Sequence, residues 1–202
     1  MFSGIIEATS RVLRLVHHEK STHLTLERPT DFVDLKTGDS IAVDGVCLTL
    51  ESFNESELTF VVGYESQRIL GWTEAFMKAH RFNLERSLRM GDRIHGHWVS
   101  GHVDSLAEIL KTEAQGESWV IHLRLATSLL PLVWHKGSVA LNGVSLTINS
   151  VDKDVISVCL IPETLRRTNL GLLRAGDSLN VEPDLMARAI QRAIETRKGE
   201  LI

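Results

Sequence analysis

The chain of 202 residues has little cysteine and no marked excess of one charge. Two cysteines, Cys47 and Cys159, are too few for a disulfide framework in a chain of this size, so a reduced, cytoplasmic protein is expected. A formal charge of −4 without a basic run argues against nucleic acid and anionic lipid as partners. No apolar run approaches bilayer length, and the first residues lack the pattern of a secretion signal, so no membrane association is expected.

What the sequence does contain is a long internal repeat. Residues 40–49 return as residues 138–147 with six identities at an offset of 98. Residues 65–66 match 163–164 at the same offset, and residues 2–7 match 99–104 at an offset of 97. A repeat of this length predicts a duplicated domain of roughly 90 residues rather than a solenoid unit.

Each copy has the pattern of an all-β domain. Asp44-Gly45 and Asn142-Gly143 are typical of type I′ hairpin turns, which need positive φ at both turn residues. Short strand-like runs flank these turns and recur elsewhere, at residues 12–16, 23–26, 41–43, 46–50, 58–62, 119–123 and 155–159. Because closure removes exposed strand edges, a duplicated small barrel is expected.

Two segments depart from the β pattern. Residues 87–98 connect the copies and are expected to be partly helical at most. Residues 185–198 are predicted to form an amphipathic helix with Asp184 as its N-cap. Its apolar stripe comprises Leu185, Met186, Ala189, Ile190, Ala193 and Ile194. The stripe can pack on its own chain or form an oligomer contact, and the pattern favours neither.

The strand after each hairpin turn carries two small polar side chains on one face. Alternation places Cys47 beside Thr49, and Ser145 and Thr147 repeat this arrangement in the second copy. Such a pair can line a ligand pocket, or its hydroxyl groups can bond to the backbone. The copies also differ in charge, because Lys136 and Asp184 stand where the first copy has Gly38 and Ser87. Surface solvation is the ordinary explanation for such charges.

Histidines cluster at His95, His97 and His102. A zinc site is one interpretation, but matched carboxylate or thiolate ligands are not evident, and no metal site is predicted. His102 stands where the first copy has Ile5. A histidine there could move a proton beside a pocket, or it could be a surface or capping residue.

Taken together, five segments resemble the riboflavin synthases. Residues 2–5, 44–49, 96–104, 142–147 and 161–170 keep that family's order and spacing across essentially the whole chain. The resemblance implies two similar six-stranded Greek-key barrels, at 1–97 and 98–184, and a C-terminal oligomerisation helix at 185–202. It also implies a homotrimer, active sites between the N-terminal barrel of one subunit and the C-terminal barrel of its neighbour, and an association with lumazine synthase.

The resemblance further implies a transferase of riboflavin biosynthesis that needs no cofactor. Two molecules of 6,7-dimethyl-8-ribityllumazine would exchange a four-carbon unit, giving riboflavin and a ribitylamino-pyrimidinedione. The implied catalytic residues are Phe2, Cys47, His102, Ser145 and Thr147. The implied substrate-binding residues are Gly4, Ser40, Thr49, Val62, Ser66, Gly101, Lys136, Ile161, Thr164 and Asp184. Positions at which the two copies differ are candidates for assigning the donor and acceptor roles.

The first copy departs from the family pattern between Ile69 and His80, where the Thr-Asn-Leu-Gly turn of the second copy is missing. His95 also stands where the family has glycine. The main competing function is a non-catalytic lumazine-binding or flavin-binding protein of the same fold. A metalloenzyme that uses the three clustered histidines and a purely structural trimer are two more distant candidates. The joint presence of Cys47, His102, Ser145 and Thr147 favours the synthase.

Overall fold

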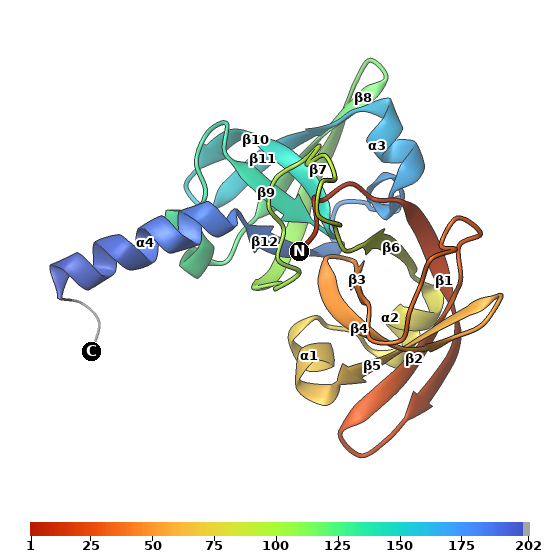
Figure 1. Ribbon diagram of the computed structural model, residues 1–202. Helices are drawn as coiled ribbons and strands as arrows, with labels where there is room; N and C mark the ends of the chain where they lie inside the picture. The colour runs from red at the N-terminus through yellow and green to blue at the C-terminus, as the bar shows by residue number, and fades with distance from the viewer. Residues whose placement is uncertain (200–202) are drawn as a thin grey trace.

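A computed structural model describes residues 1–199, apart from the side chains of Glu65 and Lys198. It contains two closed six-stranded antiparallel barrels, from which helix α4 projects (Figure 1). The first barrel is formed by β1 (Ala8–His17), β2 (Ser21–Glu27), β3 (Ser40–Val43), β4 (Val46–Phe53), β5 (Glu57–Gly63) and β6 (Arg81–Arg86). The second is formed by β7 (Ser105–Gln115), β8 (Ser118–Arg124), β9 (Ser138–Leu141), β10 (Val144–Asp152), β11 (Val155–Leu160) and β12 (Ser178–Pro183). The predicted duplicated barrel is confirmed.

The two barrels share one topology. Their strand orders are β1-β2-β5-β4-β3-β6 and β7-β8-β11-β10-β9-β12, so the connection after the second strand crosses the barrel end in Greek-key fashion. Register shifts follow Val12 in β1 and Leu50 in β4, and the same shifts follow Ile109 in β7 and Ile148 in β10. Such bulges bend a strand and so help a small sheet to close.

The hairpin turns adopt the predicted conformation. Asp44 and Gly45 have φ angles of 47° and 78°, and Asn142 and Gly143 have φ angles of 45° and 80°. The two turns lie back to back, because a Cβ atom built on Gly45 would stand 2.7 Å from the Gly143 nitrogen. Glycine is therefore required here both for its positive φ and for the close approach of the barrels.

Each barrel has a hydrophobic core of its own. Leu24, Leu50 and Phe60 belong to the first core, and Ile121 and Val158 belong to the second. A third, small cluster of Phe2, Ala42, Val99 and Ala140 lies apart from both. The two copies therefore fold around separate cores and meet through small side chains and polar groups.

Several short helical segments were not predicted. They are α1 (Tyr64–Ile69), α2 (Glu74–Ala79), α3 (Pro162–Arg167) and the 3-10 turns η1 (Thr127–Leu132) and η2 (Asn169–Leu172). At four to six residues, each is too short to show a helical period in the sequence. The connector between the copies, residues 87–98, contains no helix.

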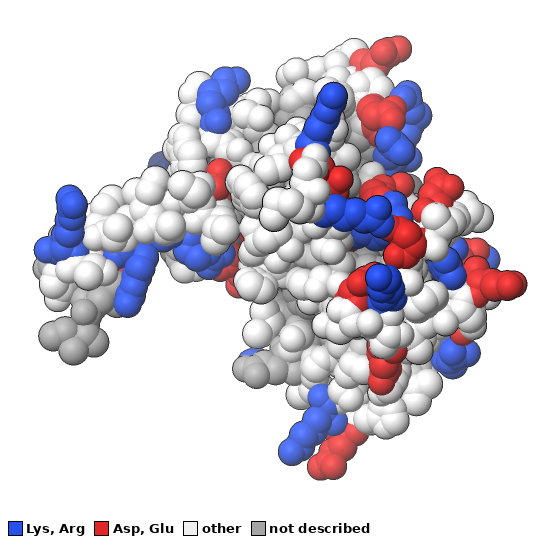
Figure 2. All heavy atoms as spheres, in the orientation of Figure 1, with Lys and Arg blue, Asp and Glu red and all other residues white. Residues whose placement is uncertain are grey.

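Helix α4 (Leu185–Lys198) has the predicted limits and N-cap. The Met186 backbone N–H donates to Asp184 Oδ1 at 2.9 Å. Met186, Ile190 and Ile194 on its apolar stripe are 59%, 56% and 44% exposed, so within residues 1–199 these side chains do not pack on their own chain. Figure 2 shows uncharged surface running from this helix onto the adjoining barrel, and in this view the visible acidic residues lie mostly at the end of the molecule away from the helix. Residues 200–202 of the predicted C-terminal unit lie outside the described residues.

Of the helices in residues 1–199, none is long and apolar enough to cross a membrane.

Candidate functional site

A groove of about 540 Å³ opens on the first barrel beside β4 and β5. This volume is in the range of small-molecule sites. The Cys47 and Thr49 side chains alternate with the buried Leu48 and Leu50, as the strand period requires. The groove is lined by Thr37, Gly38, Cys47, Leu48, Thr49, Leu50, Glu51, Val61, Gly63 and Ser66. It therefore brings together Cys47, Thr49 and Ser66 from the predicted site, and Ser40 pairs with Thr49 on the adjacent strand.

The second copy repeats this set of positions. Shifting the groove residues by 98 gives Lys136, Ser145, Thr147, Ile161 and Thr164, all of which are predicted site residues. Lys136 has a φ of 67° and its counterpart Gly38 a φ of 96°, so the two share an unusual left-handed backbone. The second barrel thus presents the same backbone frame with more polar and bulkier side chains.

Val62 is the exception among the predicted groove residues. Its side chain is 1% exposed and belongs to the core of the first barrel, whereas the flanking Val61 and Gly63 line the groove. The second copy shows the same alternation. Its Leu160, which corresponds to Val62, is buried, and the predicted site residue Ile161 corresponds to the groove residue Gly63. The strand alternation therefore removes the Val62 side chain from the groove.

The segments before each barrel cross over to the other barrel. The Cys47 backbone N–H donates to the Gly101 carbonyl at 2.8 Å, and the Ser145 N–H donates to the Gly4 carbonyl at 2.8 Å. A Cβ atom on Gly101 would lie 2.5 Å from the Cys47 Cβ, and one on Gly4 would lie 2.6 Å from the Ser145 Cβ. Both glycines are thus needed for close contact. At this edge, each of the two strands is bonded to the segment that leads into the other barrel.

Two buried carboxylates anchor the crossing segments. Glu85 accepts hydrogen bonds from the Ser3 backbone N–H at 2.6 Å and the Gly4 N–H at 3.0 Å. Glu182 accepts from the backbone N–H groups of Ser100 and Gly101 at 2.7 and 3.0 Å. Burial raises the pKa of Glu85, while these donors oppose the rise. Sequence reasoning missed both carboxylates, although each ends a repeated Asn-aliphatic-Glu motif.

Phe2 and His102 lie differently with respect to the grooves. Phe2 is fully buried between the crossing segments, and its N–H donates to the Val99 carbonyl at 2.8 Å. Its side chain packs with Ala42, Val99 and Ala140 in the small third cluster. His102 is exposed and directly follows Gly101, which contacts Cys47, but His102 is not among the residues that line the first groove. Its counterpart Ile5 follows Gly4 on the side of the second groove.

The His97 ring is hydrogen-bonded to Ser145, the residue of the second copy that corresponds to Cys47. Its Nδ1 lies 2.7 Å from Ser145 Oγ, and its buried Nε2 has no hydrogen-bond partner within residues 1–199. Gly96 permits this approach, since a Cβ atom there would stand 2.8 Å from Ser145 Oγ. The Cys47 thiol, at the matching position of the first groove, has no such histidine partner in the described part of the chain.

Burial lowers the pKa of His97, and the nearby carboxylates of Asp184 and Glu182 oppose this shift. The ring is therefore neutral near pH 7. When the neutral ring carries its proton on Nε2, the Ser145 hydroxyl donates to Nδ1 and its oxygen gains nucleophilic or basic character. Sequence reasoning considered His97 only as a metal ligand. Its partnership with Ser145 depends on a contact 48 residues apart that leaves no periodic signal.

The lowered pKa of His97 predicts an acid-sensitive stability. Because folding favours the neutral ring, this contribution is complete above the ordinary histidine pKa of about 6.5 and is lost as the pH falls below it. Between about pH 7.5 and about pH 5.5, we expect the Tm of the protein to fall by roughly 2–4 °C more than that of His97→Gln. Scanning calorimetry of both proteins measures the difference, and equal decreases would contradict the expectation.

Within residues 1–199, no group of three or more His, Cys, Asp or Glu side chains is arranged to hold a metal ion. His95 and His102 are both exposed, whereas His97 is turned toward Ser145. The three clustered histidines therefore have separate surroundings.

Two equivalent barrels, one with a ligand-sized groove and the other with the equivalent residues, are typical of a tandem small-molecule-binding protein. The lumazine binding domain family matches the chain twice, over residues 3–87 and 100–184. Solved structures give the same fold. LumP complexed with riboflavin has a TM-score of 0.82 at 20% identity, covering 91% of this chain and 99% of that chain. LumP complexed with 6,7-dimethyl-8-(1′-D-ribityl) lumazine has a TM-score of 0.80 at 19% identity, with the same coverage.

Curated relatives narrow the class. The riboflavin synthase of Chlamydia pneumoniae is 42% identical over 191 residues, covering 93% of this chain and 92% of the relative. That of Brucella abortus is 37% identical over 202 residues, covering 98% of this chain and all of the relative. The chain therefore belongs to the riboflavin synthase family.

Proposed function

We propose that the protein converts two molecules of 6,7-dimethyl-8-ribityllumazine into riboflavin and 5-amino-6-(ribitylamino)pyrimidinedione. The observation that carries the proposal is the groove on the first barrel, whose residue positions recur in the second barrel. A reaction between two identical molecules needs two similar binding positions, and the chain offers Cys47 with Thr49 in one and Ser145 with Thr147 in the other. One lumazine loses its four-carbon unit to the other, so all atoms of the two substrates appear in the two products.

The unequal chemistry of the two grooves suits unequal roles. Ser145 is hydrogen-bonded to His97, whereas Cys47 is a free thiol beside the His102 segment. One groove can therefore activate an oxygen nucleophile at C7 of its lumazine, while His102 moves a proton at the C7 methyl group of the other. Asp184, which also caps α4, lies near His97 and would accept hydrogen bonds from ribityl hydroxyl groups. Stacking the two rings supplies proximity on the order of 7–11 kcal/mol.

The active species in this proposal is a homotrimer. The exposed apolar stripe of α4 is the contact surface, and the N-terminal barrel of one subunit faces the C-terminal barrel of the next. The bidentate ion pair from Arg188 to Asp104, at 2.7 and 2.6 Å, fixes the direction in which the helix leaves the barrels. Such pairing of two grooves would bring the donor and acceptor rings together.

A non-catalytic lumazine-binding protein is the second candidate, because the fold is close to that of LumP in complex with riboflavin. One assay distinguishes the synthase from the binding protein. We expect purified protein incubated with 6,7-dimethyl-8-ribityllumazine to develop riboflavin absorbance, with consumption of two substrate molecules for each riboflavin. Bound lumazine that persists without conversion would support the binding protein and contradict the synthase.

Cys47→Ser tests whether the difference between the grooves matters. The substitution gives the first groove the hydroxyl of the second, without its histidine. We expect lumazine affinity to change by less than about threefold and turnover to fall by about tenfold or more, because a serine without a base is a poor nucleophile and proton carrier. Steady-state kinetics with a binding titration measure both quantities. Ser52→Ala, farther along β4 and outside the groove lining, is the control, and full turnover by Cys47→Ser would remove this asymmetry from the mechanism.

A further inference from the structure

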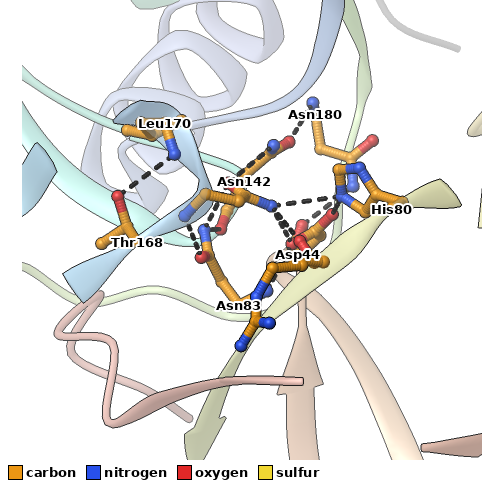
Figure 3. A network of polar contacts seen from close by, with 9 residues as sticks. Asp44, His80, Asn83, Asn142, Thr168, Leu170 and Asn180 are labelled. Atoms are coloured by element: carbon orange, nitrogen blue, oxygen red, sulfur yellow. Dashed lines mark hydrogen bonds and ion pairs between the residues drawn. The ribbon is translucent and has the colours of Figure 1, made fainter. Parts of the chain in front are cut away.

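The two hairpin turns meet in a reciprocal hydrogen-bond network between the barrels (Figure 3). The Asn83 backbone N–H donates to Asp44 Oδ1 at 2.7 Å, and the Asn180 N–H donates to Asn142 Oδ1 at 2.7 Å. The side-chain amides then cross the junction. Asn83 Nδ2 donates to the Asn142 carbonyl at 2.9 Å, and Asn180 Nδ2 donates to the Asp44 carbonyl at 2.8 Å. Up to this point the network has two-fold symmetry.

The symmetry fails at one position, where the first copy has a carboxylate and the second an amide. Asp44 is 1% exposed, so its carboxylate is buried at the junction. A buried carboxylate is costly without matching donors and a counter-charge. Asn142, its counterpart, is neutral and donates through Nδ2 to Asn169 Oδ1 at 3.2 Å.

Two residues outside the symmetric set stabilise Asp44. Asn169 Nδ2 donates to Asp44 Oδ1 at 2.8 Å, reaching across from the second copy. Its position in the first copy is occupied by Gly71, which has no side chain to offer. His80 Nε2 lies 2.5 Å from Asp44 Oδ2, with the histidine side chain only 11% exposed. The divergent segment after Ile69 thus ends at His80, whose ring contacts the buried Asp44 carboxylate.

The His80 ring is held rigidly in this place. It stacks on Phe76 of α2, with ring centres 4.4 Å apart, and meets Phe82 of β6 edge-on at 4.8 Å. Asp44 lies in the turn that precedes β4, three residues before Cys47. The contacts therefore run from α2 through His80 and the turn to the strand that forms the first groove.

We propose that His80 is a positioning residue of the first groove, which acts by hydrogen-bonding the Asp44 carboxylate and so holding the turn and Cys47 against the second barrel. In the second copy an asparagine needs no such partner. The positional role does not depend on what the groove binds, whereas any effect on turnover rests on the proposed function.

Amide hydrogen exchange followed by mass spectrometry tests the proposal without using activity. The His80→Leu variant keeps an apolar side chain against Phe76 but removes the histidine contact from Asp44 Oδ2. Exchange in residues 40–50 is expected to accelerate about tenfold or more, with less than about twofold change in residues 138–148, the matched segment of the same molecule. Equal acceleration in both segments, or none in either, would overturn the proposal.

The double variant Asp44→Asn/His80→Leu provides the rescue. Because it gives the first copy the neutral asparagine of the second, exchange in residues 40–50 is expected to return to within about threefold of the starting protein. If His80→Leu does not fold, the double variant decides alone, and failure of the double variant to fold contradicts the proposal. A normal rescue together with no riboflavin formation by the unmodified protein would refute the proposed function and leave the role of His80 standing.

Discussion

Replacing Ile190 with aspartate is expected to dissociate the protein into monomers and to lower riboflavin formation by on the order of a hundredfold or more. Ile190 is 56% exposed at the centre of the apolar stripe of α4. In the proposed trimer the side chain is buried, and an aspartate there would bring an unpaired charge into an apolar contact. Sedimentation and a riboflavin assay on the same sample measure the two effects.

The matched control for Ile190→Asp is Arg192→Asp, which places the same residue on the opposite face of α4. We expect this control to sediment and turn over like the unmodified protein, because exposed single charges contribute little. Monomeric but fully active Ile190→Asp protein would show that each chain carries a complete site. Unchanged sedimentation would show that the stripe is not the subunit contact.

Ser145→Ala is expected to lower turnover by about a hundredfold while changing lumazine affinity by less than about threefold. The hydroxyl is the only partner found for the buried His97 ring within residues 1–199, and it lies on the groove face of β10. Loss of the Ser145 hydroxyl removes the activated oxygen but leaves the other residues that would bind lumazine in place. Rapid-mixing kinetics separate the binding of lumazine from its conversion.

A double-mutant cycle shows whether Ser145 and His97 act as one unit. If they do, His97→Gln should cost about as much turnover as Ser145→Ala, and the double variant should lose little more than either. Ser150→Ala is a control on the same strand, because Ser150 bonds to Ser157 at 2.5 Å outside the groove positions. Additive losses would assign the two residues to separate steps.

The duplication and the hairpin turns could be predicted because they depend on local chemistry. The Asp-Gly and Asn-Gly pairs specify positive φ at both residues, and the structure has it at both turns. The α4 helix was predictable because it is long and regularly amphipathic. Strands β6 and β12 gave no such signal. Both are buried along most of their length, and both carry buried polar residues. Asn83 donates to the other copy, and Glu182 accepts from the segment that precedes its own barrel.

The composition of each groove was only partly predictable. Residues on one strand, such as Cys47 and Thr49, follow from the strand period. The crossover of the Gly4 and Gly101 segments does not, because either barrel could receive them without changing any local pattern. For the same reason the sequence placed His102 in a site without showing that the preceding residue, Gly101, contacts Cys47. The contact between His80 and Asp44 could not be predicted, because the hairpin turn alone explains why an aspartate stands at position 44.

The number of lumazine molecules that each chain holds tests the central claim most directly. Equilibrium dialysis of Ser145→Ala, which turns over slowly, against 6,7-dimethyl-8-ribityllumazine measures this number under conditions in which substrate persists. The repeated groove predicts two bound molecules for every chain. Saturation at one molecule per chain would contradict it, because a single pteridine would then have no neighbour from which to receive carbon.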